Sequence, residues 1–309
     1  MKALIIGITG FVGRHLTHEL HRNNYEVYGA DIVSQGDNIL ECDILDRVSI
    51  LNVLKQVKPS VVFHMAGQSS VAKSWSNPNL TFDLNVKGTI NLLETIKGFN
   101  KEIKVLLVGS SDQYGKITVQ DGIVNEEVPL CPATPYAISK CAQEELGKLY
   151  HTAYGMNIYL TRSFNHIGIG QSKGFVIPDV ASGIAEIEAH KSDTLKIGNL
   201  AVKRDFCDVR DIVRAYRLIV EKGRRGVVYN VGSGKTYCIQ ELVDKLVAMS
   251  ECTIKIKCDP SRMRPSDVPC IQCDHSRLTQ ETGWQPEVDI EKTLKDILNY
   301  FRMVVKNEE

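Results

Sequence analysis

A tyrosine and a lysine four positions apart stand near the middle of the chain, in the segment Thr134-Pro135-Tyr136-Ala-Ile-Ser-Lys140. A threonine followed by a proline is typical of a helix start, and residues four apart on a helix share one face. Tyrosine has an ordinary pKa of about 10, and a nearby ammonium group favours its phenolate form. We therefore predict general acid–base chemistry, in which Tyr136 transfers a proton and Lys140 lowers the pKa of Tyr136.

A second polar cluster, Ser110-Ser111-Asp112, directly follows the apolar run at residues 103–108. The carboxyl ends of parallel strands face the cleft where ligands bind in open α/β sheets. A hydroxyl placed there can donate a hydrogen bond to a substrate oxygen. Ser110 is therefore predicted to complete a site with Tyr136 and Lys140.

Three glycines with the spacing G-x-x-G-x-x-G, at Gly7, Gly10 and Gly13, separate the first apolar run from the first helical pattern. Such glycines let backbone N–H groups approach a pyrophosphate at a helix N-terminus. Asp31 ends the second apolar run, where a carboxylate can accept hydrogen bonds from an adenosine ribose. Asp43, further along the chain, is a weaker candidate for the adenine site. The alternatives are an ordinary strand-to-helix turn and solvated turn residues.

Composition narrows the function classes. The chain has 309 residues, 43% hydrophobic and 24% charged, with 37 basic and 37 acidic side chains. These values are typical of a globular protein, and the balanced charge gives no reason to expect nucleic acid or a membrane surface as partner. There is no apolar run long enough to span a bilayer. The nine cysteines are an odd number in a chain of this size, which favours reduced thiols and a cytoplasmic location.

The elements that must hold these residues alternate between strand and helix over residues 1–165. Short β-rich runs and longer helical patterns of this kind predict a doubly wound parallel sheet of the Rossmann type. The predicted strands are 3–6, 26–30, 61–65, 103–108 and 158–161, and the predicted helices are 11–22, 46–58, 81–97 and 135–154. Residues 166–309 break this rhythm and predict a smaller α/β substrate-binding lobe, although the chain can cross between lobes. Its predicted helices are 175–190, 211–222, 239–249 and 290–303, and its strands are 195–197, 227–230 and 253–256.

Together these motifs resemble the extended short-chain dehydrogenase/reductase family over nearly the whole chain. The resemblance implies an NAD(P)-binding Rossmann domain, catalysis by Ser110, Tyr136 and Lys140, and a homodimer formed through helices 81–97 and 135–154. It also implies that Lys140 holds the nicotinamide ribose. The cofactor-binding positions that it implies are Gly7, Gly10, Phe11, Val12, Gly13, Asp31, Asp43, Ile44, Ala66, Gly67, Asn85, Tyr136 and Lys140.

The second lobe is similar to that of family members that act on GDP-hexoses. The segments 161–171, 204–211 and 262–267 match their sugar-nucleotide-binding regions, although Ile169 replaces the usual proline. Arginine binds diphosphates in a bidentate manner, and an aspartate can bind ribose hydroxyls. Arg210 and Asp211 are equally well explained as an ion pair. The substrate-binding positions implied are Ser110, Ser111, Asp112, Asn165, Phe175, Val176, Lys196, Arg204, Arg264 and Asp267.

The expected reaction is the NAD(P)H-dependent reduction of the 4-keto group of GDP-4-dehydro-6-deoxy-D-mannose to GDP-D-rhamnose. The alternatives are a GDP-mannose 4,6-dehydratase, another nucleotide-sugar epimerase or reductase, and, more remotely, a non-catalytic redox sensor. Dehydratases of the family carry a glutamate where this chain has Asp112, and a long arginine-containing loop where this chain has a short stretch before Asp43. Asp31 would repel the extra phosphate of NADPH, and Ala30 and Ile32 carry no positive charge, so NADH is the expected cofactor, with NADPH possible.

Other polar groups are expected to be structural, and no metal site is expected. A C-x-x-C pair with a nearby histidine lacks the second ligand pair that zinc usually needs. Three histidines on the first helix are predicted to lie on a solvated face, and both tryptophans are predicted to be packing residues. The C-x-x-C pair is Cys270 and Cys273, and the nearby histidine is His275. The helix histidines are His15, His18 and His21, and the tryptophans are Trp75 and Trp284.

Overall fold

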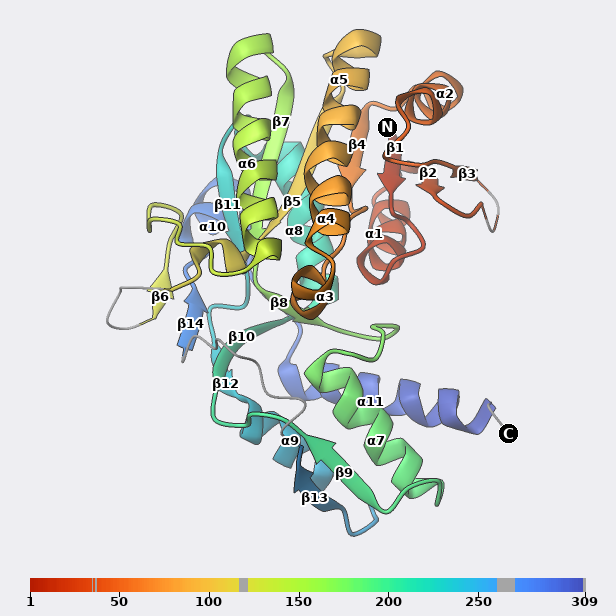
Figure 1. Ribbon diagram of the computed structural model, residues 1–309, viewed down its shortest axis with the longest axis vertical. Helices are drawn as coiled ribbons and strands as arrows, with labels where there is room; N and C mark the ends of the chain where they lie inside the picture. The colour runs from red at the N-terminus through yellow and green to blue at the C-terminus, as the bar shows by residue number, and fades with distance from the viewer. Residues whose placement is uncertain (35, 37, 117–121, 260–269, 308–309) are drawn as a thin grey trace.

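The computed structural model describes residues 1–34, 36, 38–116, 122–259 and 270–307. Its largest element is a seven-stranded sheet with the strand order β11-β7-β5-β4-β1-β2-β3 (Figure 1), and every neighbouring pair is parallel. The strands are β1 (Lys2–Ile6), β2 (Glu26–Asp31), β3 (Ile39–Glu41), β4 (Val61–His64), β5 (Lys104–Ser110), β7 (Asn157–Ser163) and β11 (Val228–Val231). The predicted doubly wound parallel sheet is thus confirmed.

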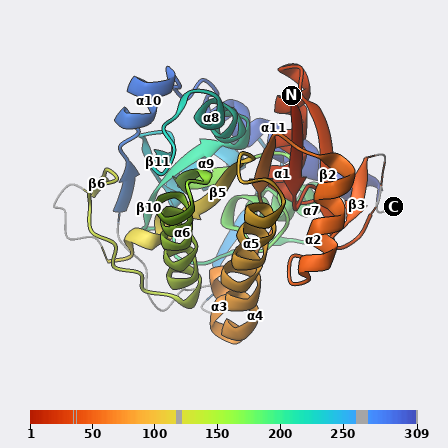
Figure 2. The same cartoon turned by 90° about the horizontal axis from the view of Figure 1, so that it is seen from above.

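Helices cover both faces of this sheet (Figure 2). One layer contains α2 (Arg47–Val57), α5 (Gly88–Asn100) and α6 (Pro135–Tyr154), and the opposite layer contains α1 (Phe11–Arg22), α8 (Val209–Lys222) and α10 (Ser276–Thr282). Alternate residues of β1 supply the two cores, since Leu4 packs towards α2 and α5 whereas Ile5 packs towards α1 and α8. The continuous apolar strands therefore reflect burial on both faces.

A smaller lobe lies below the carboxyl edge of the sheet (Figure 1). Its core is formed by α7 (Val176–Glu188), α9 (Ile239–Ala248) and α11 (Ile290–Asn307). Two small sheets accompany these helices. Their strands are β6 (Ile123–Val124), β8 (Asn165–Ile167), β9 (Thr194–Ile197), β10 (Lys203–Asp208), β12 (Thr236–Cys238), β13 (Lys255–Cys258) and β14 (Cys270–Cys273).

The chain passes between the two lobes more than once. After β8 and β10 have entered the smaller lobe, α8 returns to the large sheet and β11 pairs with β7 at its edge. The segment before α11 also returns, because Trp284 is buried in the core beneath α8. The seven-stranded sheet therefore includes residues from both sides of position 165.

The prediction for residues 81–97 is wrong in detail. The chain there forms α3 (Val71–Ser76), α4 (Pro78–Phe82), a π-helical turn η1 (Asp83–Lys87) and then α5. Asn77 accepts a hydrogen bond from Leu80 N and precedes Pro78, so the helix begins earlier than the apolar periodicity indicates. Trp75, predicted to pack, is 59% exposed on α3. Among the residues with described placement, no helix is long and apolar enough to cross a membrane.

Candidate active site

Tyr136 and Ser110 meet at the carboxyl edge of the large sheet. Thr134 caps α6 by accepting a hydrogen bond from Ala137 N at 3.0 Å, and Pro135 occupies the first helical position, as predicted. The hydroxyl group of Ser110 lies beside that of Tyr136. Burial raises the pKa of Tyr136 strongly, the charge of Asp112 raises it further, and the Ser110 hydroxyl opposes these effects. The phenol is therefore held in its protonated form, ready to donate.

Lys140 lies one turn further along α6 and is buried. Its ammonium group donates hydrogen bonds of 2.8 Å to Val108 O and to Gln143 Oε1. Burial lowers the pKa of Lys140 to about 8. Contrary to the sequence-based expectation, the pKa of Tyr136 is raised, because burial outweighs any effect of the nearby ammonium group.

A buried polar network, missed in the sequence, ties Ser110 to α6. The amide of Ser110 donates to Gln113 Oε1 at 2.8 Å, and Gln113 Nε2 donates to Glu144 Oε2 at 2.7 Å. Glu144 forms a bidentate pair with Arg162 of β7, with distances of 2.8 and 2.7 Å. An arginine in a strand buried on both faces was the available signal, because such a charge requires a buried partner.

Asn85 holds the loop after β4 against α6. Its Oδ1 accepts a hydrogen bond from Gln68 N at 2.8 Å, and its Nδ2 donates to Gln68 O at 3.0 Å and to Ser139 Oγ at 2.9 Å. Gly67 is required beside it, because a Cβ there would lie 2.7 Å from Asn85 Oδ1. Asn85 thus positions the helix that carries Tyr136 and Lys140.

The glycine loop forms an open helix N-terminus. The first helical hydrogen bond of α1 runs from Arg14 N to Gly10 O, so the amides of Phe11, Val12 and Gly13 precede it. A Cβ on Gly13 would lie 2.5 Å from Gly7 O, and one on Gly7 would lie 2.6 Å from Ala66 N. Only glycine permits this close turn, and its free amides suit a diphosphate.

Asp31 reaches back to the glycine loop. Its Oδ2 accepts hydrogen bonds from Thr9 N at 3.1 Å and from Thr9 Oγ1 at 2.6 Å, and its Oδ1 accepts one from Ile32 N. Arg14 Nε donates to Thr9 O at 2.8 Å, so a guanidinium group lies on the same loop. Arg14 is not a neighbour of Asp31 in the chain, so its position beside this loop was not predicted from the sequence.

The remaining cofactor candidates surround the strand ends beside the glycine loop. Asp43 is exposed, and its Oδ1 accepts a hydrogen bond from Leu45 N at 2.8 Å. Ile44 is buried and packs against Gly88 of α5, where a Cβ would lie 3.0 Å from its side chain. The carboxylate of Asp43 therefore remains accessible, while Ile44 forms part of the core wall.

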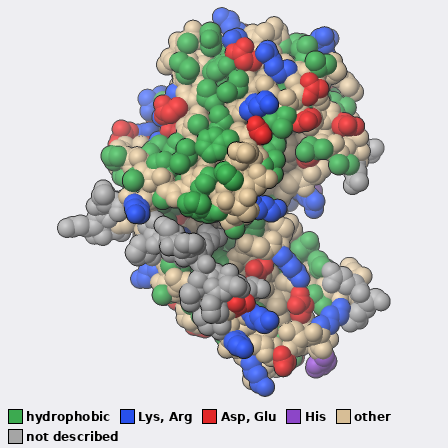
Figure 3. Space-filling view, viewed as in Figure 1, with side chains coloured by type: hydrophobic (Ala, Val, Ile, Leu, Met, Phe, Trp, Pro, Cys, Tyr) green, Lys and Arg blue, Asp and Glu red, His purple; other side chains and the backbone are tan. Residues whose placement is uncertain are grey.

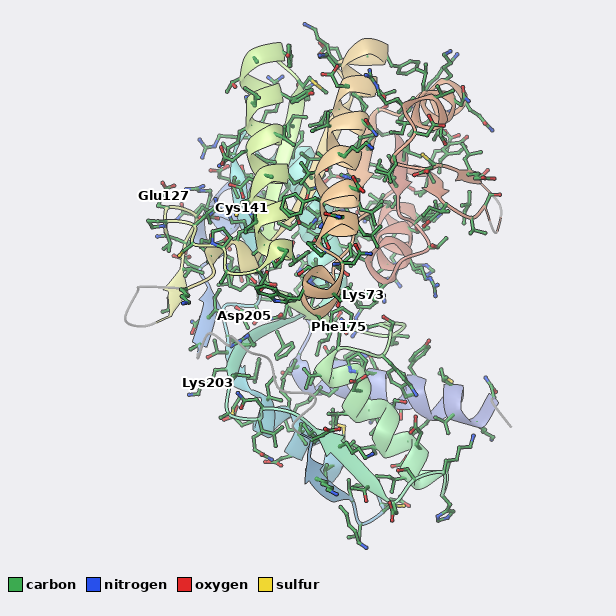
Figure 4. The ribbon with its side chains drawn as sticks, viewed as in Figure 1. Lys73, Glu127, Cys141, Phe175, Lys203 and Asp205 are labelled. Atoms are coloured by element: carbon green, nitrogen blue, oxygen red, sulfur yellow. The ribbon has the colours of Figure 1, made fainter. Side chains whose placement is uncertain are left out.

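The predicted substrate-binding residues are distributed over both lobes, and the surface is hollowed between these lobes (Figure 3). Asn165 is exposed on β8, and Phe175 lies at the start of α7 below Lys73 of α3 (Figure 4). Val176 follows in the first turn of α7. Asp112 is exposed near Tyr136, whereas Ser111 is buried.

Two basic candidates lie further away on strands of the smaller lobe. Lys196 is exposed on β9, and Arg204 on β10 donates to Lys203 O at 2.8 Å. Arg264 and Asp267 fall outside the described residues. Arg210 forms ion pairs with Asp208 and Asp296. Asp211 pairs with Arg214. Both residues therefore take part in ion pairs, although not with each other.

Other polar clusters have structural roles. Asp205 on β10 accepts hydrogen bonds from Ser233 N, Ser233 Oγ, Gly234 N and Cys273 N, and so joins three segments of the smaller lobe. Cys270 and Cys273 are free thiols. Within the described ranges, no three His, Cys, Asp or Glu side chains are arranged to hold a metal ion.

Comparisons with known proteins place this geometry in context. The family model for GDP-mannose 4,6 dehydratase matches residues 4–297. The GDP-6-deoxy-D-mannose reductase of Pseudomonas aeruginosa is 34% identical over 308 residues, which cover 99% of each chain. A GDP-mannose 4,6-dehydratase of Vibrio cholerae is 27% identical and covers 96% of this chain and 92% of its own.

Solved structures give the same result. RMD from Pseudomonas aeruginosa, complexed with NADPH, has a TM-score of 0.88 and 32% identity, and the match covers 98% of this chain and 100% of that chain. The UDP-glucose 4-epimerase of Thermotoga maritima, solved with UDP-glucose, has a TM-score of 0.86 and 26% identity, covering 99% and 100%. With its glycine loop, its Ser110, Tyr136 and Lys140 and its full-length matches, the chain belongs to the GDP-mannose 4,6 dehydratase family of extended short-chain dehydrogenases/reductases.

Proposed function

We propose that this protein uses a nicotinamide cofactor to reduce the 4-keto group of GDP-4-dehydro-6-deoxy-D-mannose, forming GDP-D-rhamnose. The observation that carries the proposal is the placement of the Ser110 and Tyr136 hydroxyl groups side by side, with the buried Lys140 one turn further along α6. The similarity to a GDP-6-deoxy-D-mannose reductase over 99% of both chains supports the substrate class.

In this reaction Ser110 and Tyr136 act on the carbonyl oxygen. A bound nicotinamide cofactor supplies the hydride, and its diphosphate fits the free amides of the glycine loop. Ser110 Oγ donates a hydrogen bond that holds the carbonyl oxygen, and Tyr136 donates its phenolic proton to that oxygen as negative charge develops. Lys140 offers its ammonium protons to the cofactor ribose and favours the phenolate that remains.

For the cofactor we propose NADH in preference to NADPH. Asp31 presents a carboxylate next to the glycine loop, where a second ribose phosphate would meet like charge. NADPH is the second candidate, because Arg14 lies on the same loop and the RMD structure holds NADPH.

A GDP-mannose 4,6-dehydratase is the second candidate function, favoured by the family model and by the Vibrio cholerae relative. A dehydratase must remove a proton from C5 and expel the C6 hydroxyl, which requires a further acid or base besides tyrosine. Asp112 lies near Tyr136, but its side chain is one methylene shorter than the glutamate of those enzymes. A displacement of about 1 Å can cost roughly 10² in rate, so we favour the reductase.

Product analysis separates the two functions. Purified protein is incubated with GDP-4-dehydro-6-deoxy-D-mannose and either NADH or NADPH, and separately with GDP-mannose. We expect one reduced cofactor to be consumed for each GDP-D-rhamnose formed and no conversion of GDP-mannose. Conversion of GDP-mannose to its 4-keto-6-deoxy product without net cofactor consumption would establish the dehydratase instead. Tyr136→Phe is the matched control in both reactions.

We further propose that the protein is a homodimer acting in the cytoplasm. Ile138 and Leu149 on α6 and Leu80 and Phe82 on α4 are exposed apolar side chains. Hydrophobic side chains gather over this part of the surface in the space-filling view (Figure 3). A second copy of the chain would cover this face. Free thiols, as described for eight of the cysteines, fit a reducing compartment.

A further inference from the structure

A cluster of three rings joins the glycine loop to residues 166–171, which comprise the end of β8 and the turn that follows it (below, the turn 166–171). The ring of Phe11, the first residue of α1, stacks on the His166 ring with 6.2 Å between centroids and an interplanar angle of 11°. Phe11 also contacts His15 edge-on, at 5.4 Å and 80°. The cluster Phe11–His15–His166 therefore combines residues from the large sheet's first helix and from the smaller lobe.

A hydrogen bond strengthens this connection. His15 Nε2 lies 2.8 Å from Ile169 O, and burial lowers the pKa of His15, so the neutral imidazole donates its Nε2 proton to that carbonyl. His15 is thus not part of a freely solvated face, in contrast to the sequence-based prediction, whereas His18 and His21 are exposed as expected.

The same turn has no room to shift towards α8. A Cβ on Gly168 would lie 2.5 Å from Val209 Cγ1 and 3.5 Å from Phe11 Cε2. Gln171 Nε2 donates to His166 O at 3.2 Å and closes the turn on itself. Residues 168–171 are therefore held by α1 and α8, which belong to the cofactor side of the molecule, while His166 and Ile167 are also paired with β10.

Both ends of this connection lead to candidate binding residues. The amide of Phe11 is one of the free amides of the glycine loop. Asn165 precedes His166, and Phe175 begins the helix that follows the turn. A displacement of the turn would move the chain that leads to Phe175 relative to the glycine loop, while Asn165 is held by β10.

We propose that His15 is a positioning residue that couples the two ligand sites: through Ile169 O and Phe11 it holds the turn 166–171 so that an occupied glycine loop strengthens sugar-nucleotide binding. The role of this turn in sugar binding rests on the proposed function, whereas the coupling between α1 and the turn does not. Coupling of this kind is reciprocal, so the sugar nucleotide strengthens cofactor binding by the same factor.

Hydrogen–deuterium exchange of the full chain tests the coupling without turnover. The variants are His15→Ala, His15→Gln, whose amide nitrogen can also donate to Ile169 O, and His18→Ala as the matched exposed control. We expect the amides of residues 166–171 to exchange about two- to tenfold faster in His15→Ala, the range for loss of one neutral hydrogen bond. NADH should slow this exchange in the wild type and in His18→Ala, and His15→Gln should restore much of the effect.

Steady-state kinetics then separate positioning from general support of the fold. His15→Ala should raise KM for the keto sugar about two- to tenfold, with kcat within about twofold and the Kd for NADH within about threefold of the wild-type values. Equal exchange in His15→Ala and His18→Ala would overturn the proposal, as would an NADH Kd that worsens as much as the sugar KM. If no keto sugar is reduced by the wild type, the proposed function fails, and the exchange data alone decide the coupling.

Discussion

At the scale of single residues, burial acts in opposite directions on the two ionisable groups of the candidate site. It raises the pKa of Tyr136 and lowers the pKa of Lys140 to about 8, because in each case the uncharged form is favoured away from water. The protonated phenol of Tyr136 can act as a proton donor. Lys140, with a pKa of about 8, can release and take up a proton near neutral pH at a small cost in free energy.

Replacement of Tyr136 tests its role as proton donor. Tyr136→Phe retains the ring but removes the hydroxyl that lies beside Ser110. We expect kcat to fall about 10²–10⁴-fold, the usual contribution of a general acid, while NADH binding measured by fluorescence persists. Turnover within about threefold of the wild type would show that another group donates the proton.

The lowered pKa of Lys140 has a consequence for stability. Between its folded pKa of about 8 and its unfolded pKa of about 10.5, the unfolded chain holds the proton and the folded chain has lost it. Unfolding therefore takes up a proton in this window, and stability rises with pH by at most about 1.4 kcal/mol per unit. This contribution is lost as the pH falls through 8.

Urea unfolding of the wild type and of Lys140→Met across pH 7.5–10 measures this effect. The free energy of unfolding of the wild type should rise relative to that of the variant, by about 2–3 kcal/mol in total. Taking the difference removes the contributions of other groups that titrate in the same range. A difference that is independent of pH would contradict a depressed pKa for Lys140.

Asp31 is predicted to set the cofactor preference. With the wild type, kcat/KM should be at least about tenfold higher for NADH than for NADPH, since each ~1.4 kcal/mol of repulsion is a factor of ten. Asp31→Ala should narrow the ratio by relieving that repulsion. Arg14→Ala is the companion variant, and it should weaken use of NADPH more than use of NADH. Equal efficiency of the wild type with both cofactors would refute the prediction.

Residue patterns predicted some parts of this site better than others. The four-residue spacing of Tyr136 and Lys140 and the strand-end position of Ser110 follow from local periodicity, and the structure brings Tyr136 and Ser110 into contact. Arg14 and His15 could not be assigned in this way. Their partners, Thr9 O and Ile169 O, are backbone atoms, and in the case of His15 the contact joins positions 154 apart in the chain.

At the scale of elements, the orientation of α6 relative to β5 and β7 depends on the buried pair of Glu144 and Arg162. Both side chains are at most 5% exposed, and they also bind Gln113, Tyr114, Glu126 O and Lys148. Loss of Arg162 leaves the buried carboxylate of Glu144 with Lys148 as its ion-pair partner, which is more costly than loss of an exposed pair.

Arg162→Met should therefore lower the free energy of unfolding by about 3–5 kcal/mol. The expected cause is the loss of the bidentate cation beside the buried carboxylate of Glu144, which keeps only Lys148 as an ion-pair partner, so adding Glu144→Gln to Arg162→Met should recover part of the loss. Lys292→Gln, which removes an exposed helix pair with Asp296, serves as control and should leave stability nearly unchanged. Chemical denaturation measures all of these variants, and a small effect of Arg162→Met alone would argue against the network.

Two helices with strong start signals were predicted to the residue. Residues 11–22 and 135–154 match α1 and α6, because Gly10 precedes the first and Thr134-Pro135 marks the start of the second. The helix predicted at 81–97 was wrong because its start signal, Asn77-Pro78, lies before the apolar periodicity, and because the π-helical turn η1 interrupts the constant pitch that periodicity assumes. β3 has only three residues, which is too short for a recognisable pattern.

At the scale of the whole molecule, the exposed apolar face of α4 and α6 predicts association. Light scattering at micromolar concentration should give the mass of a homodimer. Leu149→Asp should shift the protein to the monomer by placing a charge in the apolar interface. Met303→Asp, a change at an equally exposed apolar residue on α11, should remain dimeric. A monomeric wild type would contradict the prediction.

The return of α8 and β11 to the large sheet also bears on how proteins of this architecture can evolve. A gene cut after codon 165 would encode a sheet that ends in β7, with its hydrogen-bonding edge unpaired and the core beneath α8 uncovered. Recombination at a single crossover would therefore exchange α8 and β11 together with the sugar-binding lobe, and both would have to fit the sheet of the other parent. New substrate specificity is instead expected to arise by substitution within the loops at the carboxyl edge of the sheet, while the interleaved path of the chain is inherited as one unit.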